Sequence, residues 1–260
     1  MKFKTSDHVV LDYTDEGQGQ PIVILTGFGG AKAIWRSQVG VLIAAGYRVI
    51  NVDSRNHGLS MHTDKGLQIS RLAMDVYELM QALQLQQPIV MGNSMGAAIW
   101  FAYVSLFGDD GLKAVIDVDQ SPKMLNTPDW SYGFKDVTWA DFPEFFYQPL
   151  GSATYQHIDN LTYQAVKRIA KIEPFDNELT QPLLIDHAFQ DWRDVVAQLT
   201  VPLLIIAGGQ SPYFNPEFAA VTAKLAVRGQ SVVVPEAGHI VMAEQADAFN
   251  QAMLRFLTTI

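Results

Sequence analysis

Residues 88–96 read PIVMGNSMG, an apolar run that leads directly into the pattern Gly-x-Ser-x-Gly. The segment that follows, AAIWFAY at residues 97–103, is compatible with a helix. The sequence therefore predicts a strand, a sharp turn and a helix, with Ser94 at the apex of the turn. Such a turn holds a nucleophile clear of its own backbone and leaves no room for a Cβ atom at Gly92 or Gly96. We interpret Ser94 as a candidate nucleophile, because the predicted elements on both sides are those that the motif requires.

Apolar runs and helix-compatible segments alternate on both sides of this motif. Strands are expected at residues 21–25, 47–53, 112–119, 202–207 and 231–234, and helices at residues 34–44, 70–83, 216–226 and 242–257. This alternation predicts an α/β fold, a mostly parallel sheet with helices on both faces. Two short alternating stretches at residues 1–5 and 9–13 are expected to form an antiparallel hairpin.

The alternation breaks after residue 120. From Ser121 to Pro182 the chain is aromatic and irregular, and a helix is expected only near residues 162–172. We predict that residues 1–120 and 183–260 form one core and that residues 121–182 are a cap (lid) inserted over the sheet. The aromatic side chains of this insertion either pack it onto the core or line an apolar pocket.

Composition excludes several classes of function. The chain has 260 residues, of which 48% are hydrophobic, and a formal net charge of −9, which argues against a nucleic-acid partner. It has no cysteine, so disulfides, thiol catalysis and cysteine-ligated metals are excluded. The start MKFKTSDH lacks the apolar segment of a signal peptide, and the longest apolar runs are far shorter than the roughly 20 residues that span a bilayer. We expect a cytoplasmic protein with no membrane partner.

A serine hydroxyl is a poor nucleophile near neutral pH and needs a base within hydrogen-bonding reach. His239 is the candidate base, because it lies between the last predicted strand and the last predicted helix. The other five histidines are His8, His57, His62, His157 and His187. None of them stands at a position that suits this role.

Four features in this order resemble the α/β-hydrolase family. They are the loop Gly27-Phe28-Gly29-Gly30, the pattern Asp53-x-Arg55-x-x-Gly58-x-Ser60, the turn at residues 92–96, and Gly238-His239 before the last helix. The resemblance covers nearly all of the chain except the insertion. It implies an α/β-hydrolase fold and an esterase-like serine hydrolase that needs no cofactor and no metal. It also implies a structural role for Asp53 and Arg55.

The resemblance leaves the catalytic acid in an unusual place. The commonest acid of the family follows the seventh strand in a Gly-x-x-Asp pattern, but here Gly208-Gly209-Gln210 is followed by Ser211. Some hydrolases of this family carry the acid after the sixth strand, which implies Asp119 here. Asp119 would orient His239, fix its tautomer and stabilise the cation formed during attack. Asp117 is the alternative, although alternation along the strand is expected to turn its side chain to the opposite face.

Acyl transfer also needs donors for the developing oxyanion. The resemblance implies the backbone N–H groups of Phe28, in the glycine-rich loop, and of Met95, after the nucleophile. The partners expected are a small acyl substrate, such as an ester, and water. A carbon–carbon bond hydrolase, a thioesterase and a cofactor-free perhydrolase would carry the same triad. A ligand-binding protein with little turnover is the remaining alternative, favoured by the missing acid after the seventh strand.

Overall fold

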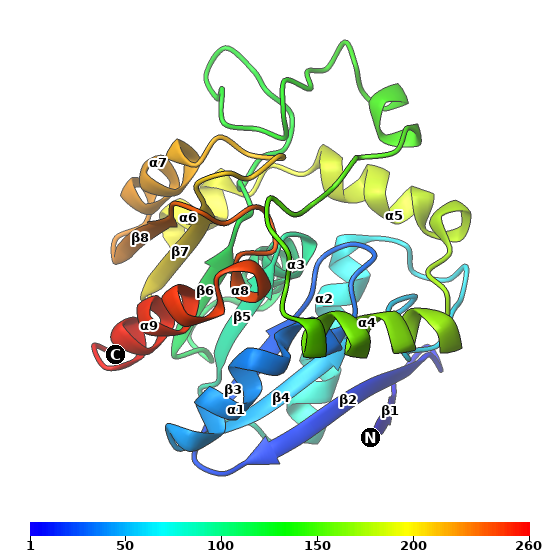
Figure 1. Ribbon diagram of the computed structural model, residues 1–260, viewed down its shortest axis with the longest axis vertical. Coiled ribbons are helices and arrows are strands. Elements are labelled where there is room, and N and C mark those ends of the chain that lie inside the picture. The colour runs from blue at the N-terminus through cyan, green and yellow to red at the C-terminus, as the bar shows by residue number, and fades with distance from the viewer.

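The computed structural model describes all 260 residues and contains one eight-stranded sheet between two layers of helices (Figure 1). The strands are β1 (Lys2–Lys4), β2 (Val10–Gly17), β3 (Gln20–Leu25), β4 (Tyr47–Asp53), β5 (Ile89–Asn93), β6 (Ala114–Val118), β7 (Leu203–Gly208) and β8 (Gly229–Val234). Their order in the sheet is β1-β2-β4-β3-β5-β6-β7-β8. Strands β3 to β8 run parallel, whereas β2 pairs antiparallel with both β1 and β4. The predicted mostly parallel sheet and its N-terminal hairpin are confirmed.

The helices cover both faces of this sheet. They are η1 (Lys32–Trp35), α1 (Arg36–Ala44), α2 (Ile69–Ala82), α3 (Met95–Phe107), η2 (Glu144–Tyr147), α4 (Asn160–Ile172), α5 (Asn177–Phe189), α6 (Arg193–Gln198), α7 (Glu217–Leu225), α8 (Val241–Glu244) and α9 (Ala246–Leu257). Helices α1, α8 and α9 pack on one face, and α2, α3, α6 and α7 pack on the other. No helix is both long enough and apolar enough to cross a bilayer.

The central strands are buried on both faces, which explains their continuous apolar sequence. In β3, Ile22 and Ile24 belong to the core beneath α1 and α9, whereas Val23 and Leu25 belong to the core beneath α2 and α3. Burial of each such side chain contributes about 1.5–3 kcal/mol to folding. The sheet is therefore a rigid support for the loops that follow its strands.

Three helices differ from expectation. The helix expected at residues 34–44 begins as the 3-10 turn η1. The helix expected at residues 242–257 is divided into α8 and α9 at Gln245, whose backbone (φ −131°, ψ 58°) is not helical. Helix α5 was not expected, and the predicted end of the insertion at residue 182 lies inside it.

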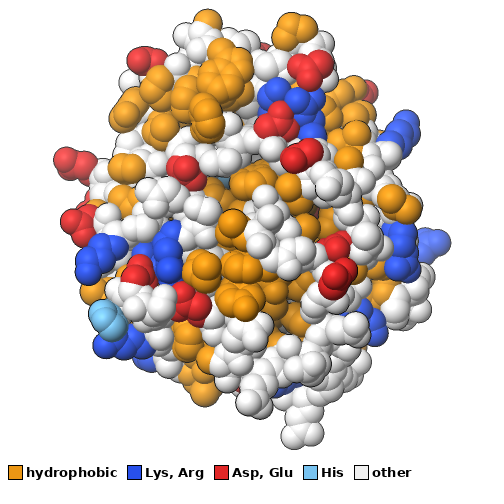
Figure 2. All heavy atoms as spheres, turned by 180° about the vertical axis from the view of Figure 1, so that it is seen from behind, with side chains coloured by type: hydrophobic (Ala, Val, Ile, Leu, Met, Phe, Trp, Pro, Cys, Tyr) orange, Lys and Arg blue, Asp and Glu red, His pale blue; other side chains and the backbone are white.

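Between β6 and α5 the chain runs through loops, η2 and α4. Its aromatic side chains divide into two groups: Phe134 and Phe146 are buried, whereas Trp139 and Tyr147 are more than half exposed. Figure 1 places the loops of this segment at the upper end of the molecule, and Figure 2 shows hydrophobic side chains gathered at the same end. Phe134 pairs with Phe214 of the core through an isolated β-bridge, which ties the insertion to the loop after β7.

Candidate active site

Ser94 lies at the sharp turn between β5 and α3, as the motif predicts. Its backbone has φ +55° and ψ −128°, a conformation that costs a residue with a side chain about 1–3 kcal/mol. The Ser94 N–H donates to the Val118 carbonyl at 2.9 Å, and the Ala97 N–H donates to the Ser94 carbonyl at 2.8 Å. These bonds hold the strained turn between the neighbouring strand and the first turn of α3.

The glycines around Ser94 permit close approach. A Cβ atom on Gly92 would lie 2.2 Å from the carbonyl carbon of Gly96, and one on Gly96 would lie 2.8 Å from the Leu25 carbonyl oxygen. A Cβ atom on Gly27 would lie 2.9 Å from the Cβ atom of Ser94. The glycine-rich loop after β3 is therefore packed directly against the serine.

Phe28 and Met95, the predicted oxyanion donors, belong to the two segments that adjoin Ser94. Phe28 follows Gly27 and lines the same cavity as Ser94. Met95 is the first residue of α3, and N–H groups in the first turn of a helix have no partner within the helix. The two residues therefore adjoin Ser94 in space or in sequence, and their role as oxyanion donors stays a prediction.

The structure brings Asp119 and His239 into direct contact. Asp119 Oδ2 lies 2.7 Å from His239 Nδ1, and both side chains are buried. Asp119 Oδ1 accepts a hydrogen bond from the Gly208 N–H at 2.8 Å. Ser211, which stands where the family usually has its acid, donates its hydroxyl to Asp119 Oδ2 at 2.7 Å. With Nδ1 bonded to a carboxylate, the other ring nitrogen of His239 is the one left free to accept a proton.

Asp117 takes no part in this contact. Its Oδ1 accepts from the Gln120 N–H at 3.1 Å, and its Oδ2 is buried without a partner. Burial, and then the charge of Asp119, raise the pKa of Asp117 well above its usual value, which favours the protonated form. The expectation that Asp117 faces away from Asp119 by alternation was wrong, because residues two apart on a strand share a face. What separates the two carboxyls is the turn at Asp119, where the chain leaves β6 with φ +55°.

The His239 ring and backbone are held from several sides. The rings of Tyr213 and Phe214 pack against the imidazole, with centroids 4.7 and 6.0 Å away. The His239 N–H donates to the Ala153 carbonyl at 2.9 Å, and the Asn93 amide donates to the His239 carbonyl at 3.1 Å. The histidine loop is therefore bonded both to the insertion and to the strand that carries the serine.

Glu244 organises the same loop, although the sequence did not single it out. Its buried carboxylate accepts backbone N–H bonds from Gly238 at 2.9 Å and from Ile240 at 3.1 Å, one residue on each side of the histidine. It also accepts from the backbone of Tyr155 and Gln156, each at 2.8 Å. One carboxylate thus joins the histidine loop to the insertion.

Ser94 and His239 line one cavity of about 160 Å³. Typical ligand pockets measure about 300–1,000 Å³, so this one suits a small group. The insertion and α5 supply Met124, Phe134, Leu150, Ala153, Leu184 and His187, and the core supplies Thr26, Gly27, Phe28, Gly30, Ile34, Asn93, Tyr213, Phe214 and Ile240. At least four residues of the insertion therefore form part of the wall above the serine.

The charged residues at the end of β4 and just after it form ion pairs. Arg55 is buried and pairs with Asp75 at 2.6 Å and with Asp7 at 3.0 Å. Asp53 pairs with Lys32 at 2.7 Å. His57 is buried with its Nδ1 on the Arg55 carbonyl at 2.8 Å, and burial lowers its pKa. None of these side chains lines the cavity.

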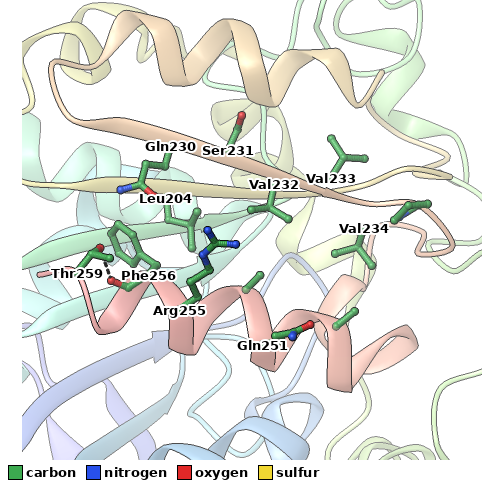
Figure 3. Close-up of a pocket in the computed structure, with 13 residues that line it drawn as sticks. Leu204, Gln230, Ser231, Val232, Val233, Val234, Gln251, Arg255, Phe256 and Thr259 are labelled. Carbon is green, nitrogen blue, oxygen red and sulfur yellow. Dashed lines mark hydrogen bonds between the residues drawn. The ribbon is translucent and has the colours of Figure 1, made fainter.

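A second hollow lies between β8 and α9 (Figure 3). It measures about 630 Å³, and its one charged side chain is Arg255. It contains none of the candidate site residues and no group that could act as a nucleophile beside a base. The hollow between β8 and α9 therefore does not compete with the cavity at Ser94 as a catalytic site.

Comparison with curated proteins gives relatives over nearly the full length. A putative non-heme chloroperoxidase from Synechocystis sp. is 29% identical over 94% of this chain and 94% of its own. The AB hydrolase superfamily protein YisY from Bacillus subtilis is 26% identical over 97% of each chain.

Solved structures share the fold at lower identity. An esterase from Exiguobacterium antarcticum has a TM-score of 0.86 at 23% identity, covering 99% of this chain and 98% of the other. A bromoperoxidase from Bacillus anthracis has a TM-score of 0.84 at 23% identity, covering 96% of each chain. Residues 20–158 match the family described as alpha/beta hydrolase fold. The chain therefore belongs to the alpha/beta hydrolase fold family.

Proposed function

We propose that the protein is a serine hydrolase that cleaves an ester or a similar small acyl compound through an acyl-enzyme. Ser94 attacks the acyl carbon while His239 takes the proton from its hydroxyl. His239 then gives this proton to the leaving group, and water releases the acid in the second half of the cycle. Asp119 holds the imidazole in the correct tautomer and stabilises its charged form.

One observation carries this proposal. The serine on the strained turn shares a small cavity with a histidine whose Nδ1 is 2.7 Å from a buried carboxylate. The missing acid after the seventh strand was the feature that favoured a ligand-binding protein. Because Asp119, at the end of β6, contacts His239 in place of an acid after β7, the geometry no longer favours a ligand-binding protein over an enzyme.

The backbone N–H groups of Phe28 and Met95 would bind the oxyanion of the tetrahedral intermediate. Loss of one such donor commonly costs about 10²–10³ in kcat. Their use of backbone atoms explains why the side chains at these positions carry no catalytic group. Residues 121–182 would act as a cap that limits the size of the acyl or alcohol group, since four of them line the cavity.

A perhydrolase is the second candidate, and the names of relatives favour it. The relatives include a putative non-heme chloroperoxidase, and the fold neighbours include a bromoperoxidase. In this reaction hydrogen peroxide replaces water as the attacking group on the acyl-enzyme. The peroxide oxygen forms a bond to the acyl carbon, the bond to Ser94 breaks, and the products are a peracid and the free serine.

A panel of p-nitrophenyl esters from acetate to decanoate tests both candidates. We expect the highest kcat/KM for the shortest acyl chains, because the cavity measures only about 160 Å³. Peracid released from acetate or an acetate ester in hydrogen peroxide would support perhydrolysis at the same site. Absence of both activities from folded protein would contradict the proposal, and Ser94→Ala is the matched control for either activity.

A further inference from the structure

One histidine of the cavity wall takes no part in the proposed mechanism. His187 lies on α5 and faces the same cavity as Ser94 and His239. Its side chain is buried, and neither ring nitrogen forms a hydrogen bond within the protein; Nδ1 is fully enclosed, so Nε2 is the nitrogen through which the ring can meet a bound molecule. No motif of the sequence contains His187.

The surroundings of His187 are those of an apolar core position. Leu183, Leu184 and Ala188 of the same helix are all buried. Burial, and secondly the nearby His239, lower the pKa of His187 to about 3, so the ring is neutral at physiological pH. A neutral imidazole has one N–H donor and one acceptor nitrogen. Buried polar groups normally have partners, and a molecule or a water in the cavity can supply the partner that Nε2 lacks.

No other polar side chain competes with His187 on this side of the cavity. The other residues that the insertion and α5 supply are Met124, Phe134, Leu150, Ala153 and Leu184, all apolar. The Tyr213 hydroxyl already donates to the Gly151 carbonyl at 3.1 Å. Among the side chains that the insertion and α5 supply to the cavity, His187 is therefore the one that can form a polar contact with a bound molecule.

Helix α5 holds this imidazole in a defined position. Asp186 accepts the Ile69 N–H at 2.7 Å, which ties α5 to the start of α2. Gln181 donates to the Phe146 carbonyl at 2.8 Å, which ties α5 to η2. A residue anchored in this way can select a substrate by hydrogen bonding, because little of its own freedom is lost on binding.

We propose that His187 is a substrate-specificity residue that donates a hydrogen bond to an oxygen atom near the scissile carbonyl. The preferred substrates would then carry a hydroxyl, ether or keto oxygen at this place, and plain alkyl esters would be poorer substrates. The inference rests on the proposed function, because it assumes that Ser94 attacks an acyl group in this cavity.

Two matched pairs of substrates test it. The acyl pair is p-nitrophenyl methoxyacetate and p-nitrophenyl butyrate, and the alcohol pair is 2-methoxyethyl acetate and butyl acetate. For each pair, the kcat/KM of the ether is divided by that of the alkyl ester. Comparing this ratio between the native enzyme and His187→Phe cancels the intrinsic reactivity of the esters. We expect the ratio to fall about tenfold in His187→Phe in one of the pairs, as for loss of one neutral hydrogen bond.

Two further variants separate a polar contact from a change of shape. His187→Gln retains a neutral donor and should restore most of the ratio. Leu184→Met changes the shape of the same wall without changing its polarity and should leave the ratio as it is. The pair in which the ratio falls identifies whether the oxygen belongs to the acyl part or to the leaving group.

Thermal unfolding completes the test. Because His187→Phe removes an unpartnered polar group from an apolar site, it should keep or raise the Tm. If His187→Phe does not fold, His187→Leu replaces it in every comparison. Unchanged ratios in both pairs would overturn the inference about His187. Failure of the native enzyme to hydrolyse any of the four esters would instead count against the proposed function.

Discussion

Asp119→Asn is the substitution for which the structure gives the most detailed expectation. Asp119 accepts three hydrogen bonds, from Gly208 on Oδ1 and from Ser211 and His239 on Oδ2. An asparagine can keep only one acceptor oxygen. If that oxygen stays on the Gly208 N–H, the new amide N–H₂ faces His239 Nδ1 and imposes the tautomer whose other nitrogen cannot accept the serine proton.

The opposite orientation of the amide is also unfavourable, because it points N–H₂ at the Gly208 N–H. That orientation leaves one donor facing another in a buried site, and such an unpaired group costs about 1–3 kcal/mol. The corresponding change in a well-studied Ser-His-Asp triad lowers kcat by about 10⁴, or about 5 kcal/mol of transition-state stabilisation. We expect a loss of this order for Asp119→Asn.

The assay is kcat on the best p-nitrophenyl ester, with Asp117→Asn as the matched control. Asp117 is buried in β6 and contacts the Gln120 N–H, not the imidazole. Its replacement by asparagine retains an oxygen for that bond and should cost less than tenfold in kcat. Activity of Asp119→Asn within tenfold of the native enzyme, with collapse of Asp117→Asn, would refute the assignment of the acid.

Three other substitutions test the surroundings of the site. Glu244→Gln places amide hydrogens against some of the four backbone N–H groups that the carboxylate accepts. It should destabilise the fold by about 2 kcal/mol, which lowers the Tm by roughly 4–8 °C. An unchanged Tm would show that the carboxylate is dispensable. Gly27→Ala should reduce kcat, because its Cβ atom would lie 2.9 Å from that of Ser94. Gly40→Ala is the control: its Cβ atom would have no other atom within 4 Å, and the substitution should stabilise α1 by up to about 1 kcal/mol. Asp117→Asn should be more stable than the native protein by a margin that grows as pH rises above about 4, because a carboxyl whose pKa is raised on folding favours the native state only while protonated. Denaturant unfolding at pH 4 and pH 8 measures this margin. An equal effect at both pH values would contradict the expectation.

The sheet was predictable because its central strands carry an unambiguous pattern. Runs such as residues 21–25 and 202–207 are apolar at every position, which suits strands buried on both faces. Helix α5 was harder to predict. Proline at position 182 lies inside it, and Leu183, Leu184 and Ile185 are consecutive and so hide the helical period. Its position is decided by contacts with α2 and η2.

The residues of the candidate site likewise divide into those that the sequence predicts and those that it does not. Ser94 and His239 stand in local motifs, and Asp119 was implied by the family resemblance, which allows the acid after the sixth strand. Glu244 and His187 have no local signal, because their roles depend on contacts with distant parts of the chain. Glu244 bonds to backbone 89 residues away, and His187 reaches the cavity only through the packing of α5 over the sheet.

The most direct test of the central claim is covalent labelling of the purified protein with a fluorophosphonate, followed by peptide mass spectrometry. Only a serine activated by a base is expected to react, so the account predicts one equivalent of label on Ser94. Labelling should fall by several orders of magnitude in rate in His239→Ala. Stoichiometric label on another residue, or none on folded protein, would contradict the account.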